Sequence, residues 1–102
     1  MTRREKLQVM LQAEPDDTFL NYSLAQACVS ANEPEEAVRL FARVRELDPN
    51  YVPAFFQAGQ LLHREGRITE AAELLKRGIS VAKLTGDQHA FEEMTGYLEN
   101  LD

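Results

Sequence analysis

Apolar residues along this chain recur every three or four positions, and no stretch alternates between apolar and polar residues as a half-buried strand does. The pattern is interrupted by prolines, glycines and short Asp- or Asn-containing clusters, which end helices. It therefore predicts an all-α protein of about six helices. The helices are expected at residues 3–13, 18–31, 34–47, 52–64, 69–84 and 88–101.

Four of these helices have a clear apolar stripe that is expected to face inward. The first helix has Leu7, Met10 and Leu11, and the second has Leu20, Leu24, Ala27 and Cys28. The third has Ala37, Leu40, Phe41 and Val44, and the sixth has Phe91, Met94, Leu98 and Leu101. On the sixth helix the opposite side is acidic and is expected to be solvated. Its members are Glu92, Glu93, Glu99 and Asp102.

The residues between the helices predict how the helices begin and end. The sequence Asp16–Asp17–Thr18 offers an N-terminal cap for the second helix, and Thr69 is expected to cap the fifth. Asn32 and Gly66 follow the second and fourth helices, where a residue in the left-handed conformation commonly ends a helix.

Residues of similar type coincide when the chain is shifted by 34 positions. Pro15 then aligns with Pro49, Ala37 with Ala71, and Leu40 with Leu74. A fixed period of this length is typical of solenoid proteins, in which each unit contacts only its neighbours. Small residues in the pattern would let the two helices of a unit approach closely, and they are Ala25, Ala37, Gly59 and Ala71.

The pattern resembles the tetratricopeptide repeat family, whose signature is W-x2-L-G-x2-Y, then A-x3-F, then P. In the first unit the matching residues are Asn21, Leu24, Ala25, Cys28, Ala37, Phe41 and Pro49. In the second they are Phe55, Ala58, Gly59, Leu62, Ala71, Leu75 and Lys83. Asn21 in place of an aromatic and Lys83 in place of proline are the clearest departures. Asn21 predicts looser packing in the first unit, and Lys83 predicts a longer fifth helix.

This resemblance implies a single helical-repeat domain over residues 1–102, built as an α-solenoid of antiparallel helix pairs in a right-handed superhelix. Residues 3–14 are interpreted as a half repeat, 18–49 as the first full repeat, 52–85 as the second, and 88–101 as a C-terminal capping helix.

The resemblance also implies that the first helix of each repeat lines a concave groove, which in this family typically binds peptide segments. The predicted peptide-binding residues are Phe19, Tyr22, Gln26, Val29, Phe56, Gln60, His63 and Arg64. Pro53, His89 and Glu92 are expected beside them. Two roles stay open for the aromatic residues, because they are suited either to anchor a partner or to pack on one another. This stripe contains no Lys and no Asn, so a clamp for a partner's C-terminal carboxylate is not expected.

Charge and composition exclude several classes of partner. The chain has 17 acidic and 11 basic residues, a formal charge of −6 that repels nucleic acid. No run of apolar residues is long enough to cross a bilayer, and the N-terminus lacks the apolar core of a signal peptide. The lone cysteine, Cys28, excludes an intramolecular disulfide and lies on a core stripe, where it is interpreted as a small buried hydrophobe. A cytoplasmic location is expected.

No arrangement of residues predicts catalysis, a metal or a cofactor. The histidines His63 and His89 lack the spacing of metal ligands, and the glycines do not form a phosphate-binding loop. The chain is therefore predicted to be a non-enzymatic interaction module, a scaffold or adaptor that binds a peptide segment of another protein. The alternative is a homo-oligomer assembled through the incomplete terminal repeats, such as a symmetric homodimer.

Overall fold

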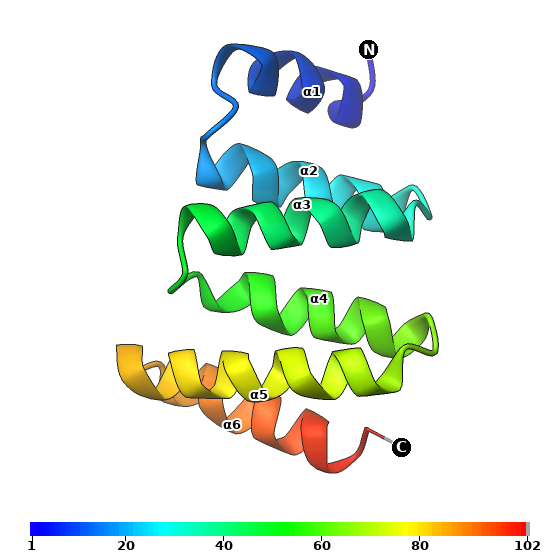
Figure 1. The fold of residues 1–102 in the computed structure, drawn as a ribbon. Coiled ribbons are helices and arrows are strands. Elements are labelled where there is room, and N and C mark those ends of the chain that lie inside the picture. Colours follow the sequence, from blue (N-terminus) through cyan, green and yellow to red (C-terminus); the bar gives the residue numbers. More distant parts are fainter. Residues whose placement is uncertain (102) are drawn as a thin grey trace. The chain divides into compact units, whose positions relative to one another are not determined.

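A computed structural model of the chain describes residues 1–101, and within them it contains helices and no strands (Figure 1). Its helices are α1 (Arg3–Ala13), α2 (Thr18–Ser30), α3 (Pro34–Leu47), α4 (Val52–Arg64), α5 (Ile68–Thr85) and α6 (Gln88–Glu99). All six predicted helices are present, and no end differs by more than about two residues, the usual uncertainty of helix boundaries. Asp102, predicted on the solvated side of the last helix, lies outside the described residues.

The contacts divide the chain into two compact units, which are described separately. The first unit is Met1–Pro49, with α1 packed on α2 and α2 on α3. The second begins at Asn50, with α4 packed on α5 and α5 on α6. In Figure 1, α2 and α3 run antiparallel in the first unit, and α4 and α5 do the same in the second.

Each antiparallel pair is closed by the same turn, with the left-handed residue in the predicted place. Asn32 has φ 58° and Gly66 has φ 80°. In the first turn the backbone N–H of Glu33 donates to the carbonyl of Cys28 at 2.9 Å, and in the second that of Arg67 donates to Leu62 at 2.9 Å. These bonds satisfy carbonyls that the helix end leaves without partners.

The starts of α2 and α5 differ in how they are capped. Asp17 caps α2 as predicted, because its Oδ1 accepts the N–H of Leu20 at 2.8 Å. The predicted cap of α5 by Thr69 is wrong, because α5 begins at Ile68 and its N-cap residue is Arg67. The turn at Gly66 brings Arg67 directly to the helix start, and the Arg67 guanidinium donates to Glu70 in the first turn. This ion pair lowers the pKa of the Glu70 carboxyl.

The core of the first unit lies between α2 and α3. Ala25, Cys28, Ala37 and Phe41 have no exposed surface. Burial raises the pKa of the Cys28 thiol, which favours the protonated, unreactive form expected of a structural cysteine.

Asn21 is buried in this unit, although sequence comparison predicted looser packing at its position. Its side chain is 4% exposed, and Nδ2 donates to the carbonyls of Pro15 at 3.1 Å and Asp17 at 2.8 Å. A buried amide is stable when its polar atoms are paired. Asn21 therefore links α2 to the turn that precedes it, a role that an aromatic side chain could not take.

One predicted core residue of α1 is exposed. Leu7 is buried and Leu11 is half-buried, but Met10 is 50% exposed. In the first unit α1 packs against α2 on one side, so only part of its apolar stripe is covered. A bidentate pair from Arg4 to Glu33, with Nη1 to Oε1 at 2.7 Å, also connects α1 to the N-cap of α3.

The second unit depends on two close approaches at glycine. A Cβ atom added at Gly59 on α4 would lie 2.8 Å from the side chain of Leu75 on α5. At Gly78 on α5 an added Cβ would lie 2.6 Å from Cβ of Phe55 on α4 and 2.8 Å from the sulfur of Met94 on α6. Gly78 therefore lets α5 contact both of its neighbours in this unit.

We expect Gly78→Ala to destabilise the protein by about 1–2 kcal/mol, because overpacking outweighs the better helix propensity of alanine. Gly96→Ala on α6 is the matched control, because an added Cβ there meets nothing within 4 Å. The control should be stabilising by up to about 1 kcal/mol. Urea unfolding followed by circular dichroism measures both changes. Equal effects of the two substitutions would contradict the close approach at Gly78.

Candidate functional site

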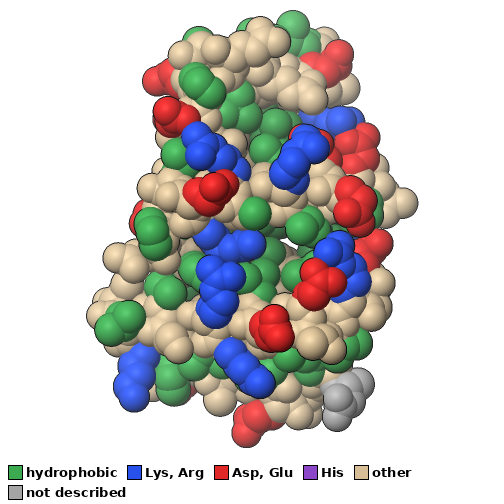
Figure 2. Space-filling model, viewed as in Figure 1, with side chains coloured by type: hydrophobic (Ala, Val, Ile, Leu, Met, Phe, Trp, Pro, Cys, Tyr) green, Lys and Arg blue, Asp and Glu red, His purple; other side chains and the backbone are tan. Residues whose placement is uncertain are grey.

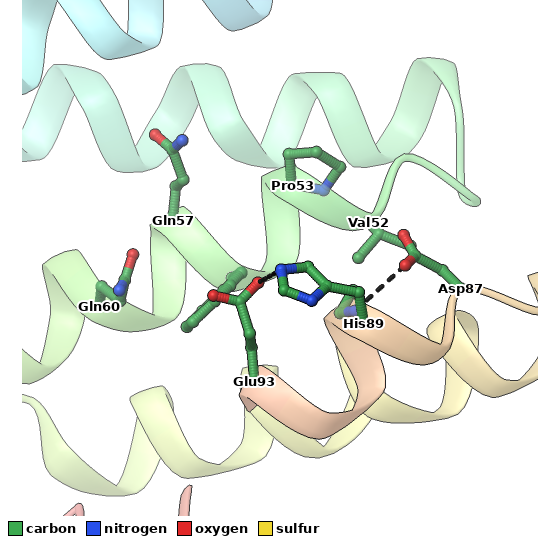
Figure 3. A pocket seen from close by; sticks show the side chains of 9 residues that line it. Val52, Pro53, Gln57, Gln60, Asp87, His89 and Glu93 are labelled. Atoms are coloured by element: carbon green, nitrogen blue, oxygen red, sulfur yellow. Dashed lines mark hydrogen bonds and ion pairs between the residues drawn. The ribbon is translucent and has the colours of Figure 1, made fainter. Parts of the chain in front are cut away.

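The second unit contains a pocket between α4 and the start of α6, with a volume of about 340 Å³ (Figure 3). Its apolar wall consists of Val52, Pro53, Phe56 and Ala90. Its polar lining consists of Gln57, Gln60, Asp87, His89 and Glu93. This volume is near the lower end of the ~300–1,000 Å³ typical of ligand sites, which suits a side chain or two rather than a large cofactor.

The apolar wall is fixed by an aromatic cluster that links α4 to α6. The rings of Phe56 and Tyr97 meet edge to face, with centroids 5.8 Å apart. The Tyr97 hydroxyl also lies 2.6 Å from Nδ1 of His63, and these two rings are nearly perpendicular at 5.5 Å. Edge-to-face pairs and hydrogen bonds both restrict side-chain rotation, so Phe56 is held in place before any ligand arrives.

The start of α6 places carboxylates beside this wall. Asp87 is the N-cap of α6, and its Oδ1 accepts the N–H of Ala90 at 3.1 Å. One turn into the helix, Glu93 pairs with Nε2 of His89 at 3.1 Å, and His89 is 86% exposed. In Figure 3 the side chains of Asp87, His89 and Glu93 come from the α6 side, while Gln57 and Gln60 come from α4, with Gln57 directed away from α6. Within residues 1–101, no Lys or Arg lines the pocket.

The predicted binding residues of the second unit separate into two groups. Phe56 and Gln60 line the pocket, together with the neighbouring Pro53 and His89. His63 instead holds Tyr97, and Arg64 is exposed outside the lining.

The sequence did not predict five of the residues that line the pocket, which are Val52, Gln57, Asp87, Ala90 and Glu93. It named Glu92 on α6, whereas the pocket is lined by Glu93 and Asp87. It also missed Tyr97, which lies one period of 34 residues after His63. The 34-residue period points toward Tyr97, but the longer α5 shifts the start of α6 and weakens that signal.

The predicted binding residues of the first unit differ in their solvent exposure. Phe19 on α2 is 66% exposed. Tyr22 is half-buried and packs edge-on against Phe41, with centroids 6.0 Å apart, and its hydroxyl accepts a hydrogen bond from Gln26 at 3.3 Å. Val29 is half-buried. Of the two aromatics here, Phe19 is therefore the one available to a partner, while Tyr22 is already engaged.

One face of the molecule has mixed charge. On the face drawn in Figure 2, Lys and Arg side chains are interspersed with Asp and Glu, as expected of an ordinary solvated surface. Among residues 1–101 no three His, Cys, Asp or Glu side chains are grouped as a metal site would require. None of the described helices combines the length and the apolar character needed to span a bilayer.

Helix pairs of this length, closed by left-handed turns and packed through small residues, define a helical-repeat protein. A sequence model of the tetratricopeptide repeat matches residues 4–58 and 29–91. A TPR repeat-containing protein of Pseudomonas aeruginosa is 30% identical over 98 residues, covering 96% of this chain and 93% of that protein.

Two further similarities concern a solved structure and a larger protein. The solution structure of a tetratricopeptide repeat domain protein from Salinibacter ruber has a TM-score of 0.81 and 31% identity, covering 86% of this chain and 89% of that one. A peroxisomal targeting signal receptor of Candida albicans is 33% identical over 76 residues, covering 74% of this chain but 13% of the receptor.

The chain belongs to the tetratricopeptide repeat family. The predicted all-α fold of helix pairs is thereby confirmed, while the handedness of the superhelix stays a prediction. Its fold is that of a protein–protein interaction module, and the family is generally a non-enzymatic scaffold.

We expect Tyr97→Phe to destabilise the protein by about 1 kcal/mol, because the ring contact with Phe56 remains but the hydrogen bond to His63 is lost. Tyr97→Ala should cost more, because it also removes the edge-to-face contact. Urea unfolding gives the free energies, and the ring proton resonances of His63 report its altered surroundings. If Tyr97→Phe leaves both unchanged, Tyr97 does not position the α4 side of the pocket.

Proposed function

We propose that this protein binds a peptide segment of a partner protein, acting as a scaffold or adaptor without catalytic chemistry of its own. The main contact in the second unit is the pocket between α4 and α6. The observation that carries the proposal is the combination there of a fixed apolar wall with polar side chains around it. Ligand sites commonly pair such a wall with a few polar groups that set orientation.

The polar side chains suit an extended peptide. The exposed side chain of Gln60 can both donate and accept hydrogen bonds, as a peptide backbone requires. Phe56 lines the pocket and its ring is already fixed by Tyr97, so little conformational entropy is lost on binding. One relative is, by name, a receptor for a targeting signal, which supports a peptide as the class of ligand.

The solvent exposure of each predicted binding residue decides whether its substitution can test this proposal. Tyr22 and Phe56 each pack against another ring, so their alanine variants would lose stability as well as binding. Gln60 and Phe19 are exposed, and substitutions there should leave the core intact.

We expect Gln60→Trp to weaken partner binding by about tenfold or more, because the larger side chain fills the mouth of the pocket. Glu73→Trp on α5, exposed and outside the pocket lining, is the control for an added surface aromatic. Fluorescence anisotropy with peptides selected from a random-sequence library measures the affinities. If Gln60→Trp and Glu73→Trp bind these peptides equally well, the pocket is not the binding site.

Self-association is a second candidate, favoured by the open side of α1. Val9 is 52% exposed and Met10 is 50% exposed on adjacent positions of this helix. Apolar side chains that are exposed together are suited to pack against a second copy, as a symmetric dimer requires.

We expect Met10→Lys to abolish any concentration-dependent dimer, because a charge would have to be buried in the interface. Gln8→Lys adds the same charge at another exposed position of α1 and should leave the dimer unchanged. Sedimentation velocity over a wide concentration range distinguishes the three proteins. A wild-type chain that stays monomeric throughout would remove this candidate.

A further inference from the structure

We infer that the pocket between α4 and α6 binds a Lys or Arg side chain of the partner peptide. This inference rests on the proposed function and names the chemistry of the ligand. It starts from the presence in one pocket of an apolar wall, of carboxylates that come from α6 and its N-cap, and of side-chain amides that come from α4.

Charge gives the first argument. Asp87 and Glu93 both line the pocket, and no Lys or Arg within residues 1–101 does so. The whole of α6 together with its N-cap contains four carboxylates and no Lys or Arg, the carboxylates being Asp87, Glu92, Glu93 and Glu99. A cleft lined by one sign of charge attracts ligands of the opposite sign.

The two carboxylates retain capacity to accept a cation. Asp87 uses Oδ1 to cap α6, and Glu93 pairs through Oε1 with the highly exposed His89. A carboxylate has two oxygens and about four lone-pair sites, so one hydrogen bond leaves the others open. Because His89 is 86% exposed, its ring can turn away into solvent when a ligand cation replaces it.

The apolar wall fits the rest of such a side chain. Lys and Arg have long aliphatic stems that pack on apolar surface while the charged end stays near polar groups. Pro53 and Phe56 provide that surface. An acidic ligand would meet carboxylates with no compensating base in the lining, and would be rejected.

The test is a selection of a random-sequence peptide library on the full chain, performed in parallel on the wild type and on Asp87→Asn/Glu93→Gln. These changes remove both charges, while Asn preserves the N-cap of α6 and Gln preserves helix propensity. Peptides enriched on the wild type should contain a Lys or Arg next to apolar residues, and the double variant should not enrich them. Glu99→Gln removes one charge from α6 outside the pocket lining and is the control.

The enriched peptides are then made with acetylated N-termini, so that no terminal amine can supply the cation. Replacing the selected Lys by norleucine, or Arg by citrulline, keeps the stem and removes the charge. We expect this to weaken binding to the wild type and to Glu99→Gln by about tenfold, the worth of one charged hydrogen bond. The same replacement should change the affinity of the peptide for Asp87→Asn/Glu93→Gln by less than about twofold, because this variant lacks the carboxylate charges with which the peptide cation interacts.

The outcomes separate this inference from the function on which it rests. Peptides that bind the wild type but not Gln60→Trp bind in the pocket. If the binding of such peptides does not depend on a basic residue, the inference is wrong and the proposed function stands. If acetylation of the N-terminus alone abolishes binding, the inference is also wrong, because the bound cation is then the terminal amine of the peptide. If neither protein enriches any peptide, the proposed function fails and the inference fails with it.

Discussion

The turn that closes each helix pair is the constraint on which the rest of the structure depends. Asn32 and Gly66 adopt positive φ, and the residue after each donates its N–H back to the fifth residue before it. This geometry reverses the chain within a few residues and fixes which side of the following helix meets the preceding one. Ala37 and Ala71 are consequently buried, and close contact between the paired helices becomes possible.

Tight pairing explains why glycine rather than alanine occupies two positions of the second unit. Gly59 and Gly78 each lie where a methyl group would overlap a neighbouring side chain. Helical glycine costs roughly 1 kcal/mol relative to alanine, a cost that close contact with Leu75, Phe55 and Met94 offsets. The position of α6 therefore depends on the absence of a side chain at Gly78, and the pocket depends on the position of α6.

Much of the fold could be predicted because the signals are local. Proline, glycine and the 34-residue period determine where helices end and which faces are apolar, and the left-handed turns at Asn32 and Gly66 were predicted from them. The two errors have different causes. Met10 was predicted to be buried because a stripe on a helix does not reveal whether a neighbour covers it. Thr69 has the residue type of a cap, but the geometry of the preceding turn places the start of α5 at Ile68.

The candidate site was harder to predict than the fold, for a reason visible in α6. A period of 34 residues relates His63 to Tyr97, but α5 continues to Thr85, past the position where proline would have ended it. The extra turn of α5 displaces the start of α6, so the residues of α6 cannot be assigned to faces by the period alone. Glu92 and Glu93 are neighbours in sequence, and only packing decides that Glu93 lines the pocket.

The later start of α6 also places an acidic residue beside the pocket. Because α6 begins at Gln88, its N-cap carboxylate, Asp87, lies at the edge of the apolar wall that α4 provides. An N-cap is most stable with an oxygen acceptor, so Asp87 has a structural reason to be acidic whatever binds nearby. Glu93 has no such reason, since it lies in the middle of a helix, is exposed, and pairs with a histidine that is itself exposed. For the cation site that we propose, the carboxylate of Glu93 is therefore more informative than that of Asp87.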